Sequence, residues 1–236
     1  MPGPVTPTAV ADRPVDSSAW APLRVPVFRR VTIAEFLSNV GSQVQDVAAA
    51  LLMTSTLAAS PTQVSLISTA GTLPVLLFAL PAGALADVVS RRTILVAGQL
   101  VLAASALVLG LLTLAGQTTV ELLLAVIFVM GLSSAAQSPA ASAVVPELVP
   151  PDQLPAALSL SAVSFNLSRI VGPVVGAALV AAAGAGAAFL VNAVSFLVVV
   201  LAFLRWREIR TASALPPEHF LAAVRVGPRY VRHTRR

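Results

Sequence analysis

The chain has 236 residues, of which 57% are hydrophobic and 11% are charged, and its formal net charge is +5. An ordinary soluble domain carries about 25% charged residues, so this composition excludes one and indicates a membrane protein. The absence of cysteine excludes disulfides, thiolate metal sites and cysteine nucleophiles within the chain. The basic residues lie between apolar runs and near the C-terminus, which favours a role in membrane topology over nucleic-acid binding.

Residues 1–27 are rich in proline and carry both signs of charge. They lack the basic, apolar and small-residue zones that follow one another in a signal peptide. We therefore expect a disordered cytoplasmic tail ahead of the first membrane helix.

Six apolar runs follow, and each is long enough for a membrane helix, which needs about 20 residues. Turn-forming residues separate the runs, at 31–57, 63–86, 93–115, 120–145, 154–183 and 187–204. The first run is the most polar and the third is the most apolar. The sequence therefore predicts an all-α membrane protein with six transmembrane helices.

Arginine is distributed unevenly around these runs. It precedes the first run, follows the second and follows the sixth, at Arg24, Arg29, Arg30, Arg91, Arg92, Arg205, Arg207 and Arg210. The turns on the opposite side carry none. Because loops with arginine stay in the cytoplasm, we expect both termini inside and a location in a bacterial-type plasma membrane.

The last part of the chain, residues 211–236, begins with two prolines and alternates apolar residues with arginine. The arginines at 225, 229 and 232 recur at spacings of four and three, which places them on one helix face. We expect a basic amphipathic linker on the cytoplasmic membrane surface.

A short charged segment separates the second and third runs. Its glycine, acidic residue and basic pair are Gly83, Asp87, Arg91 and Arg92. Charges are cheap just outside the hydrocarbon and cost about 2.5 to 3.5 kcal/mol each at its centre, so this segment marks a membrane boundary. Its spacing resembles the signature that follows the second helix in the major facilitator superfamily. Val88 stands where a basic residue is common.

Further motifs resemble the enterobactin-exporter-like, or transmembrane secretion effector, branch of that superfamily. They lie at residues 45–50, 80–87, 145–150, 164–169 and 226–233. In the fifth run, Gly172, Pro173 and Gly176 are similar to the glycine-proline motif of exporters in the superfamily, and they also favour close helix packing. The resemblance spans nearly all of this chain but only the N-terminal half of a twelve-helix fold.

This resemblance implies one six-helix half made of two inverted three-helix repeats, which rocks against a C-terminal half or a second copy. It implies that Asp87 and the basic pair form a cytoplasmic latch against that other half, although the same charges would also set topology alone. The implied partners are the lipid bilayer and a small-molecule substrate. The implied activity is proton-coupled export of siderophore-like or drug-like compounds.

Two charged residues lie deep within the expected helices. Asp46 and Arg169 each stand about 15 residues into a run, or ~22 Å along a helix. An ionisable group at this depth indicates proton coupling or substrate contact, although a structural hydrogen bond explains Asp46 equally well. The two charges are also candidates for a buried ion pair, because an unpaired charge would be costly there.

Several uncharged or acidic polar residues in the runs are candidates for lining a cavity, although for any single one of them a role in joining two helices is favoured. They are Glu35, Gln43, Gln45, Gln137, Asn166 and Asn192. The sequence shows no clustered metal ligands, phosphate-binding loop or catalytic constellation, so we expect no metal, no cofactor and no enzymatic activity.

Two other classes of function stay open at this point. A six-helix membrane scaffold or assembly protein would tolerate the all-apolar third run and a missing second half. A membrane enzyme is a more distant alternative, because the chain shows no catalytic cluster.

Overall fold

The computed structural model describes residues 18–206, except for the side chains of residues 79, 80 and 84–88. The expected tail before residue 18 and the expected linker after residue 206 lie outside this range. Within it, the chain starts to fold before the boundary expected at Phe28, because a short 3-10 helix, η1 (Ala21–Arg24), precedes the first α-helix.

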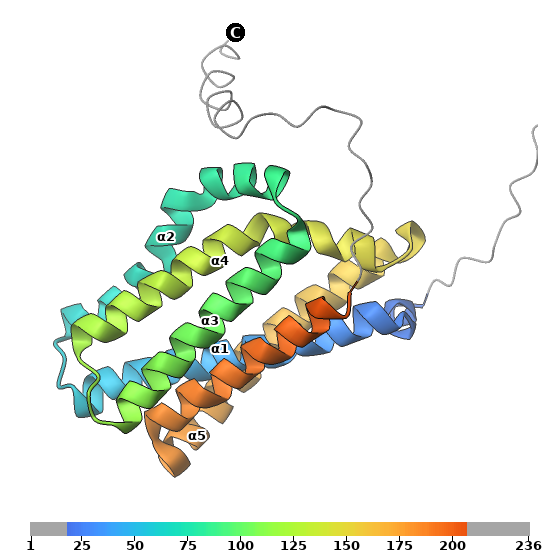
Figure 1. The fold of residues 1–236 in the computed structure, drawn as a ribbon. Helices are drawn as coiled ribbons and strands as arrows, with labels where there is room; N and C mark the ends of the chain where they lie inside the picture. The colour runs from blue at the N-terminus through green and yellow to red at the C-terminus, as the bar shows by residue number, and fades with distance from the viewer. Residues whose placement is uncertain (1–17, 207–236) are drawn as a thin grey trace, which may run out of the picture.

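The described chain is helical and contains no strand, as the sequence predicts. After η1 its elements are α1 (Pro26–Leu51), the π-helical turn η2 (Leu52–Thr56), α2 (Pro61–Val88), α3 (Arg91–Leu114), α4 (Val120–Leu148), the 3-10 turn η3 (Pro151–Gln153) and α5 (Leu154–Leu204). Figure 1 shows the long helices side by side in one bundle.

Helix α5 is two helical arms joined by a sharp reversal at Gly184. This residue has a φ of 80° and a ψ of 169°, a backbone conformation that side-chain-bearing residues avoid. We call residues 154–183 the first arm and residues 185–204 the second arm. The reversal lies where the sequence predicts the turn between the fifth and sixth runs.

Four helical stretches of the described chain are long and apolar enough to cross a membrane: Pro61–Phe78, Arg91–Leu114, Val120–Leu148 and Pro151–Leu204. The last is 54 residues long and includes both arms of α5. Helix α1 is not among the four. It contains Glu35, Asn39, Gln43 and Asp46, the polar residues that make the first run the least apolar.

Helices α2 and α4 each continue past the prolines in their sequences. The fourth run was expected to stop at Val145 because Pro146 follows it, but α4 continues to Leu148. Leu148 and Val149 are buried in an apolar cluster with Phe28, and this burial offsets the hydrogen bond that proline cannot make. In α2, which contains Pro74 and Pro81, the helix bends toward its C-terminal end (Figure 1).

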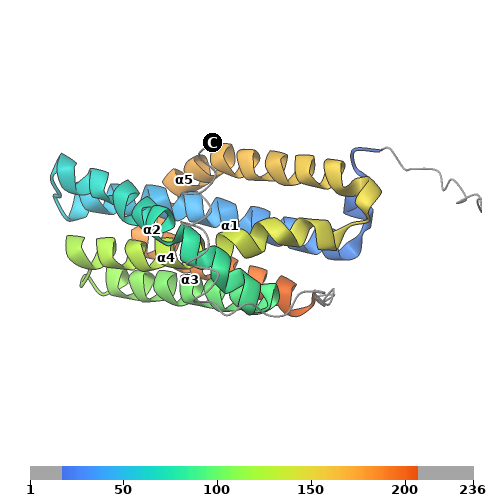
Figure 2. The ribbon, with the colours of Figure 1, turned by 90° about the horizontal axis from the view of Figure 1, so that it is seen from above.

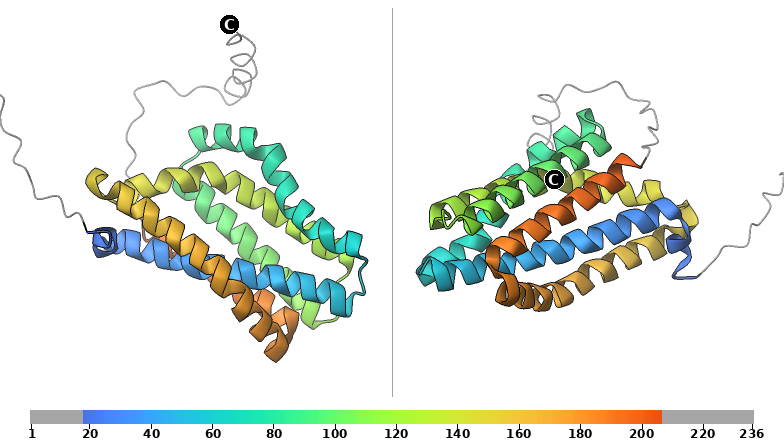
Figure 3. Two further views of the ribbon diagram at one scale, coloured as in Figure 1. Left: turned by 180° about the vertical axis from the view of Figure 1, so that it is seen from behind. Right: turned by 60° about the horizontal axis from the view of Figure 1, so that its bottom comes forward.

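The six helical rods pack in a fixed order. Helix α1 lies between the two arms of α5, as two views show (Figures 2 and 3). The second arm also packs against α3, α3 packs against α4, and α4 packs against α2. The order across the bundle is therefore first arm, α1, second arm, α3, α4 and α2.

Glycine permits the closest of these crossings. A Cβ on Gly172 of the first arm would lie 2.3 Å from Cβ of Gln43 on α1, and one on Gly176 would lie 3.0 Å from Cα of Val44. Between α2 and α4, a Cβ on Gly131 would lie 2.5 Å from the carbonyl oxygen of Gly71. Both distances below 3.0 Å are shorter than van der Waals contact, so the helices approach backbone to backbone here.

One end of the bundle holds six of the seven arginines of the described chain, and we call it the basic end: Arg24, Arg29, Arg30, Arg91, Arg92 and Arg205. The seventh, Arg169, lies in the first arm of α5. Beneath the six lies an apolar cluster that includes Phe28, Ile94, Leu148 and Trp206. The ring of Trp206 meets Phe203 edge to face, with 6.1 Å between the ring centroids. The two ends of the described chain therefore lie together at the basic end (Figure 1).

Candidate functional site

At the basic end, two arginines at the start of α3 bind the ends of two other helices. Arg91 forms an ion pair with Glu147 in the last turn of α4. Arg92 donates to the carbonyl oxygens of Phe203, at 3.1 Å, and Leu204, at 2.5 Å, where α5 ends. Because the last carbonyls of a helix lack partners and carry partial negative charge, a guanidinium is well suited to them.

The same helix start is closed by a capping serine. Ser90 accepts a hydrogen bond from the backbone N–H of Thr93 at 3.2 Å, which satisfies one of the free donors at the start of α3. The arginine contacts fix α3 against α4 and α5, and the cap stabilises the start of α3 itself. The basic pair of the charged segment is thus engaged within the bundle.

For the other two members of the charged segment, Asp87 and Gly83, no comparable contact within the bundle is described. Asp87 lies in the last turn of α2, and its side chain is outside what the structure describes. A Cβ on Gly83 would meet no atom within 4 Å, so packing inside this bundle does not require glycine there. The latch between this segment and another half therefore stays a prediction.

A buried amide network joins α1 to the second arm of α5 and to α4. The Asn192 amide is fully buried and donates to Oε1 of Gln45 at 2.8 Å. The Gln45 amide donates in turn to the sulfur of Met130 at 3.1 Å. Ser195 donates to Oδ1 of Asn192 at 2.9 Å. Two of the candidate polar residues, Gln45 and Asn192, are therefore partners in one helix-joining network.

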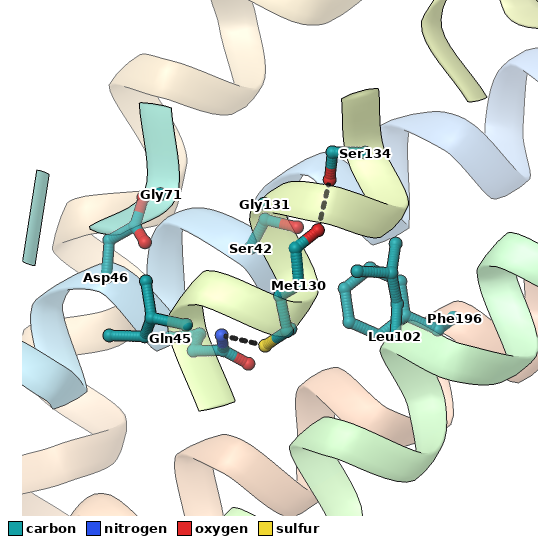
Figure 4. Close-up of a pocket in the computed structure, with 10 residues that line it drawn as sticks. Ser42, Gln45, Asp46, Gly71, Leu102, Met130, Gly131, Ser134 and Phe196 are labelled. Carbon is teal, nitrogen blue, oxygen red and sulfur yellow. Dashed lines mark hydrogen bonds between the residues drawn. The ribbon is translucent and has the colours of Figure 1, made fainter. Parts of the chain in front are cut away.

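Beside this network, five rods surround a cavity of about 180 Å³ (Figure 4). Its lining combines three polar residues of α1 with small, hydroxyl and apolar residues of the other helices: Ser42, Gln45, Asp46, Gly71, Leu102, Ile127, Met130, Gly131, Ser134 and Phe196. Asp46 is the charged member of this lining and is exposed, so the cavity can be reached from outside the bundle.

The cavity hydroxyls are already bonded to their own helices. Ser42 donates to the carbonyl oxygen of Ser38 at 3.0 Å, and Ser134 donates to that of Met130 at 3.0 Å (Figure 4). A hydroxyl has one proton and two lone pairs, so each serine has acceptor capacity left after this bond. The carboxylate of Asp46 adds further acceptors.

Two other candidate residues, Gln137 and Asn166, lie away from the cavity lining. Gln137 is buried between α3 and α4, donates to Ser133, and fills the space that a Cβ on Gly98 would occupy. Asn166 is exposed on α5 and donates to the carbonyl oxygen of Ala162 in its own helix. Neither side chain faces the cavity, because neither belongs to its lining.

Arg169 is exposed on the first arm, with its guanidinium carbon 5.9 Å from the centroid of the Phe165 ring. It does not form the ion pair with Asp46 that the sequence suggested as a possibility: within residues 18–206, Arg169 and Asp46 are not within ion-pair distance. Helix rotation decides this, since equal depth in two helices does not bring two side chains onto facing sides.

The cavity also contains residues that the sequence did not single out. Ser42 precedes Asp46 by one helical turn, so the i, i+4 spacing placed it on the same face. Ser134 lies in the small and polar stretch of α4, a pattern that favours either close packing or a cavity. Both occur, since Gly131 packs on α2 while Ser134 lines the cavity. Phe196 gave no signal, because nothing distinguishes it from other apolar residues of its helix.

No group of three or more histidine, aspartate or glutamate residues that would hold a metal ion occurs within residues 18–206.

A family of transmembrane secretion effectors matches this chain over residues 17–236. The chain belongs to that family. This confirms the family resemblance carried by the charged segment at 83–92 and the motifs around it. The matched region includes both the basic end and the cavity.

Individual relatives are more distant. Macrolide efflux protein A of Streptococcus pyogenes is 33% identical over 115 residues, which is 49% of this chain and 28% of that protein. The protein of the same name from Enterococcus faecalis is 33% identical over 109 residues, which is 46% of this chain and 34% of that protein. YfiS, an uncharacterized MFS-type transporter of Bacillus subtilis strain 168, is 28% identical over 192 residues, which is 81% of this chain and 45% of that protein. The chain spans about half the length of such relatives, or less.

Proposed function

We propose that this chain is the N-terminal half of a secondary active exporter of small molecules, embedded in a bacterial plasma membrane with both termini in the cytoplasm. The observation that carries the proposal is membership of the transmembrane secretion effector family across residues 17–236. The names of the macrolide efflux relatives make macrolides the first substrate class to test. Siderophores and other drug-like compounds follow.

The packing order supports an internal repeat of three helices. Counting the two arms of α5 as the fifth and sixth helices, the order across the bundle is fifth, first, sixth, third, fourth and second. If the first, second and third helices are renamed fourth, fifth and sixth, and the last three are renamed first, second and third, the same order results, read backwards. Because helix directions alternate along the chain, the two triplets would be inverted, as in transporters that work by alternating access.

The exposed features of the bundle support a second half as partner. Arg169 is exposed in the middle of the first arm, and a charge at that depth is too costly to face lipid. Gly83 has open space around its Cα, so a demand for glycine there would come from outside this bundle. In our proposal, both face a C-terminal half or a second copy, and Asp87 contributes to the cytoplasmic latch.

Counterflow of radiolabelled erythromycin in proteoliposomes tests this function with the complete gene product. The wild type is expected to exchange the compound, and its uphill export is expected to stop when a protonophore collapses the proton gradient. Asp87→Asn is expected to reduce transport, because the latch loses its charge, while the amount of inserted protein stays the same. Absence of exchange for macrolides, siderophores and other drugs alike would contradict export and favour a scaffold.

A further inference from the structure

Most of the polar groups that the cavity offers to a ligand are acceptors. The hydroxyl groups of Ser42 and Ser134 donate their hydrogen bonds to carbonyl oxygens of their own helices. The adjoining Gln45 amide is held by Met130 and Asn192. What remains is one Nε2 proton of Gln45, against the lone pairs of two hydroxyls and the carboxylate of Asp46, so acceptors outnumber donors. A ligand that donates hydrogen bonds suits this lining best.

The lining also has a net negative charge. Asp46 forms no ion pair with any arginine of the described chain. Its helix, α1, packs between the two arms of α5, but Arg169 of the first arm does not reach it. A carboxylate inside a membrane protein calls for a counter-ion, because the ionised form is costly without one. A cationic ligand would supply that charge.

Size limits what part of a ligand can enter. Sites that enclose a whole drug-sized molecule measure about 300 to 1,000 Å³. This cavity measures about 180 Å³, and its walls include the apolar side chains of Leu102, Ile127 and Phe196. Such a space fits a protonated amine with its small alkyl substituents, while the body of the molecule extends outside.

We propose that this cavity is the subsite for the protonated amino group of the transported compound. Asp46 is its counter-ion, and Ser42 and Ser134 accept its hydrogen bonds. This inference rests on the proposed export function and adds the substrate class, an amphipathic amine. The amide network behind the cavity positions it, since Gln45 precedes Asp46 in the chain and is fixed by two other helices.

The test compares two forms of one compound in the complete gene product. Erythromycin carries a tertiary amine that is protonated at neutral pH, and its N-demethyl-N-acetyl derivative is neutral. Counterflow without an ion gradient measures substrate recognition separately from proton coupling. In Asp46→Asn, apparent affinity for erythromycin is expected to fall about ten-fold or more, the size of one lost charge-assisted hydrogen bond. Affinity for the neutral derivative is expected to stay within about two-fold.

Two variants control the comparison. Glu121→Gln also removes one carboxylate, but at an exposed position at the start of α4, and is expected to leave both affinities unchanged. Asp46→Glu keeps the charge and is expected to retain preference for the amine. Because the 236 residues contain no cysteine, Ser134→Cys places a single thiol of this chain in the cavity wall. Erythromycin is expected to protect that thiol from alkylation more strongly than the neutral derivative.

The outcomes separate this inference from the proposed function. Wild-type counterflow of either compound supports export, and its absence for both contradicts export and the subsite together. Equal affinity of the wild type for the two forms, or an equal loss of both in Asp46→Asn, would overturn the amine subsite while export stands. Equal protection of the thiol by the two forms would also overturn it, including in the case where Asp46→Asn fails to fold.

Discussion

The basic end and the cavity both place charged side chains on a mostly apolar bundle, but they use the charge differently. At the basic end, Arg91 and Arg92 are bound to the ends of α4 and α5, so their charge is compensated within the bundle. In the cavity, Asp46 has no ionic partner among the described residues. A charge with a partner inside the bundle therefore holds helices in place, whereas a charge without one is available to a ligand or to another protein segment.

One glycine from each region, Gly131 and Gly83, gives the largest expected difference in stability. Gly131 lies at the cavity, where a Cβ would meet the backbone of α2 at 2.5 Å, and Gly83 lies at the basic end in open space. Gly131→Ala should therefore destabilise the protein by about 1 to 3 kcal/mol, because a backbone neighbour has to move. Gly83→Ala should leave stability within about 0.5 kcal/mol. Melting temperatures of the purified proteins in detergent check this, and equal melting temperatures would contradict the packing.

Arg92 gives the next largest effect, since its guanidinium satisfies two terminal carbonyls of α5. Arg92→Gln should lower stability by about 1 to 2 kcal/mol through loss of charge-assisted hydrogen bonds, a figure reduced here for partial exposure. The matched control is Arg30→Gln, which removes an exposed arginine at the same end. If the two variants melt at the same temperature, the hydrogen bonds from Arg92 on α3 to the end of α5 do not stabilise the bundle.

Two asparagines allow the stabilising effect of the amide network to be compared with that of an isolated amide. Asn192 is fully buried and donates across helices to Gln45, whereas Asn166 is exposed and donates within its own helix. Asn192→Ala should cost about 0.6 to 2 kcal/mol, the range for polar contacts between membrane helices. Asn166→Ala should be nearly neutral to stability. Comparison of thermal unfolding curves for the two variants tests the difference, and an Asn192→Ala variant as stable as the wild type would show that the network does not stabilise the bundle.

The sequence predicted the helical class and the order of the elements well, because apolar length and turn residues are local signals. The reversal at Gly184 and the break before Arg91 were both expected. The end of α4 was predicted wrongly, since a proline rule based on the local chain does not know that Leu148 and Val149 will be buried. The family resemblance was also visible, because it depends on short motifs that can be read along the chain without knowledge of the packing.

The candidate site was only partly visible in the sequence, because helix rotation is a property of the packed bundle. Asp46 was singled out by its charge, and its position in a cavity follows from packing against four other rods. Gln45 and Gln137 look alike in the sequence, yet one adjoins the cavity and the other fills a gap beside Gly98. The apolar wall formed by Phe196 had no sequence signal at all.

One paired measurement tests the central contrast most directly: melting temperature and erythromycin counterflow, recorded side by side for Asp46→Asn and Arg92→Gln in the complete gene product. Asp46→Asn is expected to keep the wild-type melting temperature and to lose recognition of the amine. Arg92→Gln is expected to melt at a lower temperature, while its folded fraction keeps wild-type affinity. A lower melting temperature for Asp46→Asn with unchanged affinity would make Asp46 a structural group and would overturn the contrast between the two regions.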